Sequence, residues 1–127
     1  MKKFLVILFI LLFQNFPSFG EWKKVTEGVR NDIFYIDFDK VKKIKGEIYY
    51  WTLINFDKRN KFGFFSITNY RKVDCKNLRY WGLKVFFYTE KMGNGIKKPG
   101  LIPNKWSNVS PGSVHEFKLK LICEKYS

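Results

Sequence analysis

The sequence predicts an α+β fold in which antiparallel strands are followed by one C-terminal helix. Short runs rich in β-branched and aromatic residues follow one another with tight polar links, which leave no room for the helical crossovers of a parallel sheet. The last segment instead opens with a helix-capping sequence. The chain has 127 residues, 46% of them hydrophobic and 20% aromatic, so we expect one ordinary core and no extensive disorder.

Five segments have the apolar patterns of strands and are bounded by turn residues. They are Trp22–Thr26, Ile33–Asp37, Glu47–Phe56, Phe64–Val73 and Leu78–Thr89. Glu47–Phe56 carries apolar side chains on both faces, which predicts a central strand covered on both sides. The basic segment Asp39–Lys45 is too short for an ordinary helix and predicts a single helical turn that ends at Gly46.

The C-terminal third begins with a segment rich in glycine and proline, Met92–Pro103, which predicts a long loop of the kind that is often functional. Ser113 and Glu116 then form a capping box at the start of a helix. Helical spacing predicts one apolar face made of Val114, Phe117, Leu121 and Ile122. A strand is the alternative, because apolar residues also alternate with lysines at Phe117, Leu119, Leu121 and Cys123. The cap favours the helix.

The first twenty residues predict a cleavable secretory signal peptide. Lys2 and Lys3 precede the apolar run Phe4–Phe13, and small residues follow up to an expected cleavage between Gly20 and Glu21. Ten apolar residues are too few for a membrane span, which needs about 20. We therefore expect residues 21–127 to form a single exported domain, periplasmic, secreted or on the cell surface, without a transmembrane segment.

Export determines how the two cysteines are interpreted. In an oxidising compartment Cys75 and Cys123 are expected to pair with each other in a disulfide. No cysteine precedes Cys75, so the mature chain has no cysteine at its start for lipid attachment.

The net charge of +13 raises the question of an anionic partner. The leader holds two lysines and no acidic residue, so the mature chain keeps a net charge of +11. Only four of the basic residues are arginine, the usual base-reading residue, and lysine-rich composition also follows from A/T-rich codons. We expect no specific nucleic-acid partner; attraction to an anionic envelope surface is the alternative that charge supports.

The sequence gives little support for catalysis, and we expect a protein that is not an enzyme. His115 is the only histidine, no motif pairs it with a nucleophile, and it is expected to be a solvated surface residue. Asp37 and Asp39 lack the graded loop of a calcium site. One histidine and two cysteines exclude a multi-ligand Cys/His metal site, and no cofactor is expected.

Several of these residues, taken in order, resemble the surface-adhesin protein E family. The resemblance spans about residues 22 to 123. The matching positions are Trp22, Val25, Ile33–Asp37, Val41, Ile44, Gly46, Trp51-Thr52-Leu53, Ser66, Tyr70, Asp74-Cys75, Tyr88, Met92-Gly93-Asn94-Gly95, Trp106, Val109, Pro111-Gly112-Ser113, Glu116 and Cys123.

The resemblance implies an antiparallel sheet of about six strands with a C-terminal helix packed on it. Together with the five strand patterns above, we expect a sheet of five to six strands. The resemblance favours the helix over the strand at 114–124 and implies a disulfide that ties Cys75 to the helix end. It also implies an exported binding module that takes extracellular proteins as partners and forms homodimers. If the chain binds protein, we expect the contact at the loop 92–103 and at exposed tyrosines or arginines.

The motif residues themselves are expected to be architectural. These positions are Trp22, Asp37, Trp51, Ser66, Asp74, Trp106, Pro111 and Ser113. The three tryptophans are expected to be core or loop anchors, because large aromatic side chains are mostly buried. No ligand-binding residue is carried over from the family.

Overall fold

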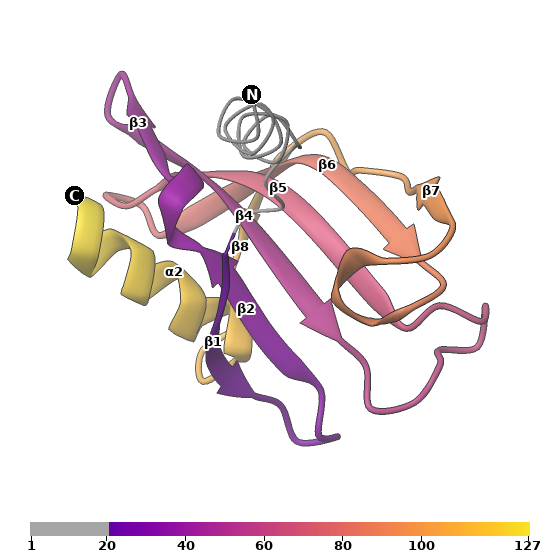
Figure 1. The fold of residues 1–127 in the computed structure, drawn as a ribbon. Helices are drawn as coiled ribbons and strands as arrows, with labels where there is room; N and C mark the ends of the chain where they lie inside the picture. Colours follow the sequence, from indigo (N-terminus) through magenta and orange to yellow (C-terminus); the bar gives the residue numbers. More distant parts are fainter. Residues whose placement is uncertain (1–20) are drawn as a thin grey trace, which may run out of the picture.

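The computed structural model describes residues 21–127, which form one antiparallel sheet and one α-helix (Figure 1). Within these residues the sheet has eight strands, and the path of neighbours is β1-β2-β4-β5-β6-β7, with β3 added to β4 and β8 to β6. The strands are β1 (Trp22–Glu27), β2 (Ile33–Asp37), β3 (Lys42–Ile44), β4 (Glu47–Asn55), β5 (Ser66–Asp74), β6 (Arg79–Tyr88), β7 (Lys97–Pro99) and β8 (Trp106–Asn108). The helix is α2 (Val114–Tyr126), so the predicted α+β class is confirmed.

The number of strands is larger than the predicted five to six, because three strands have only three residues each. The predicted helical turn over Asp39–Lys45 is wrong: a 3-10 turn, η1, covers Phe38–Lys40, and Lys42–Ile44 forms β3. The side chains of β3 are exposed, and its backbone pairs with the first residues of β4. The formation of such a strand depends on backbone pairing with its neighbour, not on burial of its own side chains. Its sequence therefore shows no alternation of apolar and polar residues.

The predicted long loop over Met92–Pro103 also contains regular structure. It follows the 3-10 turn η2 (Lys91–Gly93) and contains β7, which pairs with the end of β6. The remaining residues cross the end of the sheet toward β8, which pairs with the start of β6. The segment is therefore a loop held to β6 by backbone pairing, through β7 at the end of β6 and through β8 at its start.

The core lies between α2 and one face of the sheet (Figure 1). Its buried residues are Ile36, Ile48, Tyr50 and Val73 from the sheet, and Leu119 and Ile122 from α2. On the opposite face Leu53 is also buried, and η2 lies close to it. The prediction that Glu47–Phe56 is a central strand is confirmed for β4, which lies between β2 and β5. Its second face is buried at Leu53 and Asn55 but only half-buried at Tyr49 and Trp51, so the predicted cover on both sides extends over part of the strand.

Helix α2 begins as the capping box predicts, and its buried face differs from the predicted one at Phe117 and Lys118. The Ser113 hydroxyl accepts a hydrogen bond from the Glu116 amide at 3.1 Å, and the Glu116 carboxylate accepts from the Gly112 amide at 3.2 Å. Phe117, expected on the apolar face, is 48% exposed, whereas Lys118 is fully buried beside Leu119. The predicted apolar face is therefore confirmed for Ile122 and Leu121, which lie in or against the core, and wrong for Phe117. The buried ammonium of Lys118 donates to the Thr52 hydroxyl at 3.2 Å.

The predicted disulfide is confirmed. Cys75 and Cys123 are bonded, with their Cα atoms 5.7 Å apart and 48 positions between them in sequence. The bond joins the turn between β5 and β6 to the last turn of α2. It holds the C-terminal end of the helix against the sheet.

Candidate functional site

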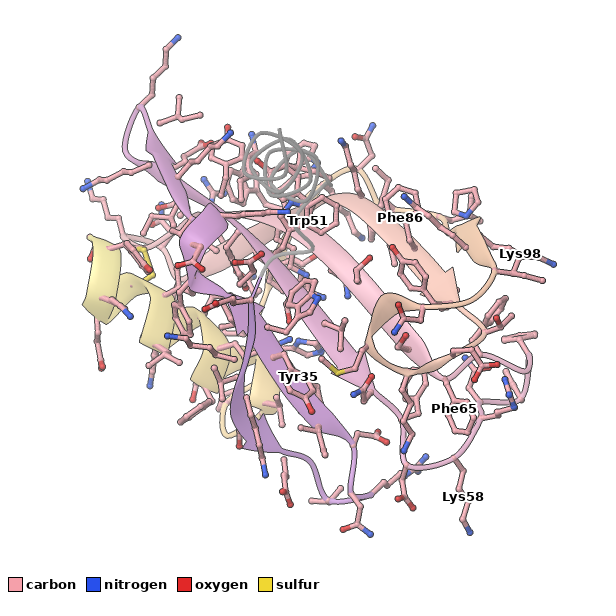
Figure 2. The ribbon with its side chains drawn as sticks, in the orientation of Figure 1. Tyr35, Trp51, Lys58, Phe65, Phe86 and Lys98 are labelled. Carbon is pink, nitrogen blue, oxygen red and sulfur yellow. A yellow bond between two sulfur atoms is a disulfide. The ribbon has the colours of Figure 1, made fainter. Side chains whose placement is uncertain are left out.

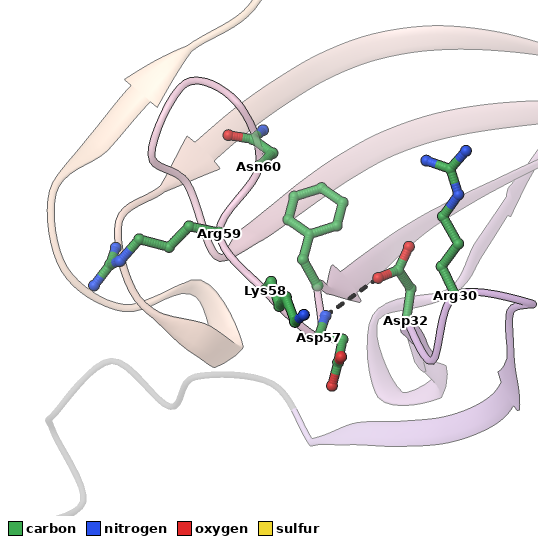
Figure 3. A pocket seen from close by; sticks show the side chains of 7 residues that line it. Arg30, Asp32, Asp57, Lys58, Arg59 and Asn60 are labelled. Carbon is green, nitrogen blue, oxygen red and sulfur yellow. Dashed lines mark hydrogen bonds between the residues drawn. The ribbon is translucent and has the colours of Figure 1, made fainter.

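A charged pocket of about 410 Å³ opens at one end of the sheet, between the turn after β1 and the turn after β4 (Figure 3). The Asp57 amide donates to the Asp32 carboxylate at 3.2 Å. Figure 3 shows the Arg59 side chain directed away from these two residues; its guanidinium lies 4.3 Å from the centre of the Phe65 ring and 3.2 Å from the Glu90 carboxylate. The lining includes no serine, cysteine or histidine, so the pocket offers no nucleophile paired with a base.

The sheet face opposite α2 carries an aromatic cluster. Alternate residues of β4, β5 and β6 and the start of β8 place their side chains on this face, as the register of the pairs shows. We call this set the aromatic face: Tyr49, Trp51, Tyr70, Trp81, Phe86 and Trp106, with Lys72, Arg79 and Lys84. Figure 2 labels Trp51 and Phe86 on it. Among residues 21–127, no α-helix covers this face.

The side chains of the aromatic face are stacked on one another and on cations. The Trp51 and Tyr70 rings are stacked with centroids 4.8 Å apart, and Trp81 meets Trp106 edge to face at 5.6 Å. The Lys72 ammonium lies 5.2 Å from the centroids of both Trp81 and Trp106. The Arg79 guanidinium lies 4.5 Å from the centroid of Trp106. Because these contacts fix the side chains in place, little conformational freedom would be lost when a partner binds.

A groove of about 350 Å³ continues the aromatic face beneath the glycine-rich loop. Its lining comes from β1, β5, β6 and the loop, and consists of Trp22, Thr68, Tyr88, Met92, Gly93, Asn94, Gly95 and Lys97. We call this the loop groove. Thr68 and Tyr70 lie on the same face of β5, so the groove and the aromatic face form one surface.

Buried polar side chains hold the loop in position. The Ser66 hydroxyl donates to the Glu90 carbonyl at 2.6 Å and accepts from the Gly93 amide at 3.0 Å. The Asn55 side-chain carbonyl accepts from the Met92 amide at 2.8 Å. Because these acceptors and donors sit on the two central strands, the loop is fixed to the most rigid part of the sheet.

The three tryptophans of the family motif, expected to be core or loop anchors, lie outside the buried core. Trp22, Trp51 and Trp106 are half-buried, and all three belong to the loop groove or the aromatic face. The pattern could have shown this for Trp51, since Tyr50 and Trp51 are neighbours on one strand and must point to opposite faces.

The other motif residues fix turns and caps. Asp37 is buried and its carboxylate accepts from the Asp39 amide at 3.1 Å, capping η1; burial raises the pKa of this carboxyl. Asp74 binds the Asn77 side-chain amide at 2.8 Å and the Arg79 guanidinium at 2.9 Å, and these hydrogen bonds lower its pKa. Pro111 is exposed in the turn before α2. Gly20 and the predicted leader lie outside the described residues, and Glu21 is the first residue described and is exposed.

His115 is not the solvated residue that the sequence suggested. It is half-buried in the first turn of α2, with its Nδ1 atom 3.4 Å from Nη1 of Arg71 and its ring centroid 6.3 Å from that of Tyr80. Burial, together with the charges of Lys118 and Arg71, lowers the pKa of His115 to about 4. Sequence reasoning missed Arg71 and Lys118 here; the one available signal is that Lys118 shares a helical stripe with Ile122, four residues on.

This pKa predicts a loss of stability in mild acid. In the unfolded chain the pKa of His115 is about 6.5, and in the folded chain it is about 4. Between these two pH values the unfolded chain therefore binds more protons than the folded chain, and acid favours unfolding. We expect the free energy of unfolding to fall by about 2 kcal/mol over this range. This is less than the full pKa difference would give, because the ring is only partly buried and solvent screens its interactions. Urea unfolding at several pH values should show this loss in the wild type. It should be absent from His115→Gln, and an equal loss in both proteins would contradict the assignment.

In residues 21–127 we find no helix of the length and apolarity that a membrane crossing requires. The described residues also contain no group of three or more histidine, cysteine or acidic side chains placed to hold a metal ion.

The fold is shared with protein E of Haemophilus influenzae. Crystal form II of that protein gives a TM-score of 0.69 at 17% identity, over 83% of this chain and 88% of the other. A selenomethionine form gives 0.67 at 17% identity, over 87% and 92%, and protein E from a non-typeable strain gives 0.59 at 16% identity, over 84% and 86%. No curated protein sequence matches the chain.

The family model described as surface-adhesin protein E matches residues 22–124, which cover every strand and nearly all of α2. The loop groove and the disulfide both fall within this match. The chain therefore belongs to the surface-adhesin protein E family.

Proposed function

We propose that this protein is an exported, non-enzymatic binding module that holds an extracellular or envelope protein on the aromatic face and the loop groove. The observation that carries the proposal is the stacked set of tryptophans, tyrosines and cations on the sheet face opposite α2. Membership of an adhesin family supports binding of this kind.

The chemistry of the surface favours a protein partner. Trp, Tyr and Arg are the side chains that most often dominate the energy of protein interfaces. Four of the six aromatic side chains on the face are Trp or Tyr within stacking or edge contact of one another: Trp51, Tyr70, Trp81 and Trp106. Lys72, Arg79 and Lys84 add positive charge, so the partner we propose presents apolar groups surrounded by acidic side chains.

Export rests on the predicted leader, residues 1–20, with cleavage between Gly20 and Glu21. A periplasmic, secreted or surface location follows from it and agrees with the family. Mass measurement of the exported protein tests this directly, because cleavage leaves Glu21 as the first residue.

The second candidate function is a structural protein of the cell envelope that binds anionic surfaces by charge. The observation in its favour is the net charge of +11 that remains after the leader, with its two lysines, is removed. Its binding would depend on the number of charges rather than on the aromatic side chains, and screening would weaken it strongly.

A binding panel at two salt concentrations separates the two functions. The panel contains extracellular-matrix proteins, anionic lipid vesicles, wall polymer and DNA, each measured at about 50 and about 500 mM salt, where the Debye length falls from about 14 to about 4 Å. We expect one protein to remain bound at high salt. Binding to every polyanion that disappears at high salt would contradict the proposal and support the envelope protein.

Homodimerisation, which the resemblance also implies, is measured in the same samples by sedimentation. A dimer that dissociates when the partner binds would indicate that both use the aromatic face. A dimer that persists in the complex would place the dimer contact elsewhere.

A further inference from the structure

A second site is indicated on the other face of the sheet, beneath the first turns of α2. Arg71 is 8% exposed and Lys118 is fully buried, and both lie close to His115. Among residues 21–127, no carboxylate lies within ion-pair distance of Arg71 or Lys118. Buried cations are normally paired, because removing a charge from water costs several kcal/mol that an opposite charge must offset. Lys118 donates a hydrogen bond to Thr52 at 3.2 Å, and burial lowers its pKa well below the usual value, so Arg71 is the charged group of this cluster that has no acidic partner among the described residues.

The contacts of Arg71 leave part of its guanidinium available. The flat face of the group lies 4.6 Å from the centroid of the Tyr80 ring, and its Nη1 atom lies 3.4 Å from Nδ1 of His115. The Tyr50 hydroxyl also lies near this group, and the charge of Arg71 opposes the rise that burial causes in the pKa of Tyr50. A guanidinium that stacks through its face keeps its N–H edge free to bind a carboxylate with two hydrogen bonds.

A pocket of about 140 Å³ adjoins this group. Its polar side is lined by Arg71, Lys84, Asn69 and Tyr80, and Ser107 of β8 adds a hydroxyl. Val85 and the exposed residues Leu101–Pro103 form its apolar side. The volume is that of a carboxyl group with a short aliphatic chain, since a water molecule takes up about 30 Å³ in the liquid.

We propose that this pocket binds the carboxylate of a small apolar acid or of a peptide C-terminus, with Arg71 pairing with the carboxylate and the 101–103 segment covering the apolar chain. Asn69 and Ser107 lie on the same wall and supply further hydrogen bonds. The site lies on the α2 side of the sheet, opposite the aromatic face, and Lys84 is the residue that it shares with the binding surface proposed above.

Calorimetric titration with butyrate, N-acetylvaline and N-acetylvalinamide tests the ligand class. We expect saturable one-site binding of at least one of the two carboxylates and none of the amide, which has no negative charge. Butyrate alone would identify free short-chain acids as the source, and a preference for N-acetylvaline would identify a peptide C-terminus. Equal binding of the amide, or no binding of either carboxylate, would overturn the proposal.

Two variants locate the site. Arg71→Met is expected to weaken carboxylate binding at least about tenfold, the loss expected from hydrogen bonds to a charged group. Gly82→Leu is expected to abolish it, because Gly82 lines the pocket and no atom lies within 4 Å of a β-carbon built there, so the new side chain can fill the pocket with little disturbance of the sheet.

The matched control is Arg79→Met, which removes an arginine from the aromatic face. It should leave carboxylate binding unchanged. If Gly82→Leu retains the cooperative unfolding of the wild type and still binds the carboxylate with wild-type affinity, the ligand is not in this pocket and the proposal fails.

Discussion

Replacing Cys123 by serine is expected to lower the free energy of unfolding by about 4 kcal/mol, the largest single effect that the structure predicts. The disulfide closes a loop across 48 positions, and in the chain-entropy model such a loop removes about this much conformational freedom from the unfolded chain. For a domain of this size the loss corresponds to a fall in the melting temperature of about 15 °C or more. Thermal and urea unfolding of the oxidised proteins provide the measurement.

The two cysteines provide their own control. Cys75→Ser should destabilise the protein by about as much as Cys123→Ser, and the double variant should be no less stable than either, because all three break the same bond. Wild-type stability in any of them, or two free thiols in a non-reducing peptide map of the wild type, would contradict this account of the bond.

Gly95→Ala is expected to destabilise the protein by about 3 kcal/mol and to displace the glycine-rich loop. Gly95 has a φ of +83°, where a β-carbon costs about 1 to 2 kcal/mol. A β-carbon built there would lie 2.2 Å from the Thr89 hydroxyl and 3.1 Å from the Glu90 amide nitrogen, so the backbone must also move. Because Gly95 lines the loop groove, partner binding should weaken together with stability.

Gly46→Ala is the matched control, since Gly46 also has a positive φ, of +80°, but no atom lies within 4 Å of its β-carbon. It should cost only the conformational term, about 1 kcal/mol, and leave binding intact. Equal destabilisation by the two substitutions would show that the packing of the loop against Thr89 and Glu90 contributes nothing.

The strands that the sequence predicts are those whose own residues carry the pattern. Ile33–Asp37 is confirmed residue for residue, and Glu47–Phe56 differs from β4 by one residue, because each alternates or concentrates apolar side chains over its whole length. The helix cap at Ser113 is confirmed because it depends only on neighbouring residues. The disulfide was predictable because only two cysteines are available in an exported chain.

The features that the sequence does not predict depend on contacts between distant residues. Strand β3 forms by pairing with β4, and its lysines give no periodic signal. Lys118 and His115 look like solvated charges in the sequence, and only the crossing of α2 over β5 shows that they lie near Arg71. The sequence does not show which face of the sheet Trp106 occupies, and the register of the sheet places it with Trp51 on the face opposite α2.

The central claim is that the aromatic face binds a protein partner, and Trp81→Ala tests it most directly. Trp81 contacts Trp106 and lies beneath Lys72, so its loss removes the middle of the stacked set. The matched control is Phe117→Ala, which removes an aromatic side chain from the exposed surface of α2. Affinity for the partner identified by the panel is measured at about 500 mM salt, where long-range charge attraction is screened.

The account predicts that Trp81→Ala weakens binding by about 30-fold or more, the range of an interface hot spot, while Phe117→Ala leaves the affinity within about twofold of the wild type. The contradicting result is equal affinity for Trp81→Ala and the wild type, with both proteins folded. In that case the partner binds somewhere other than the aromatic face.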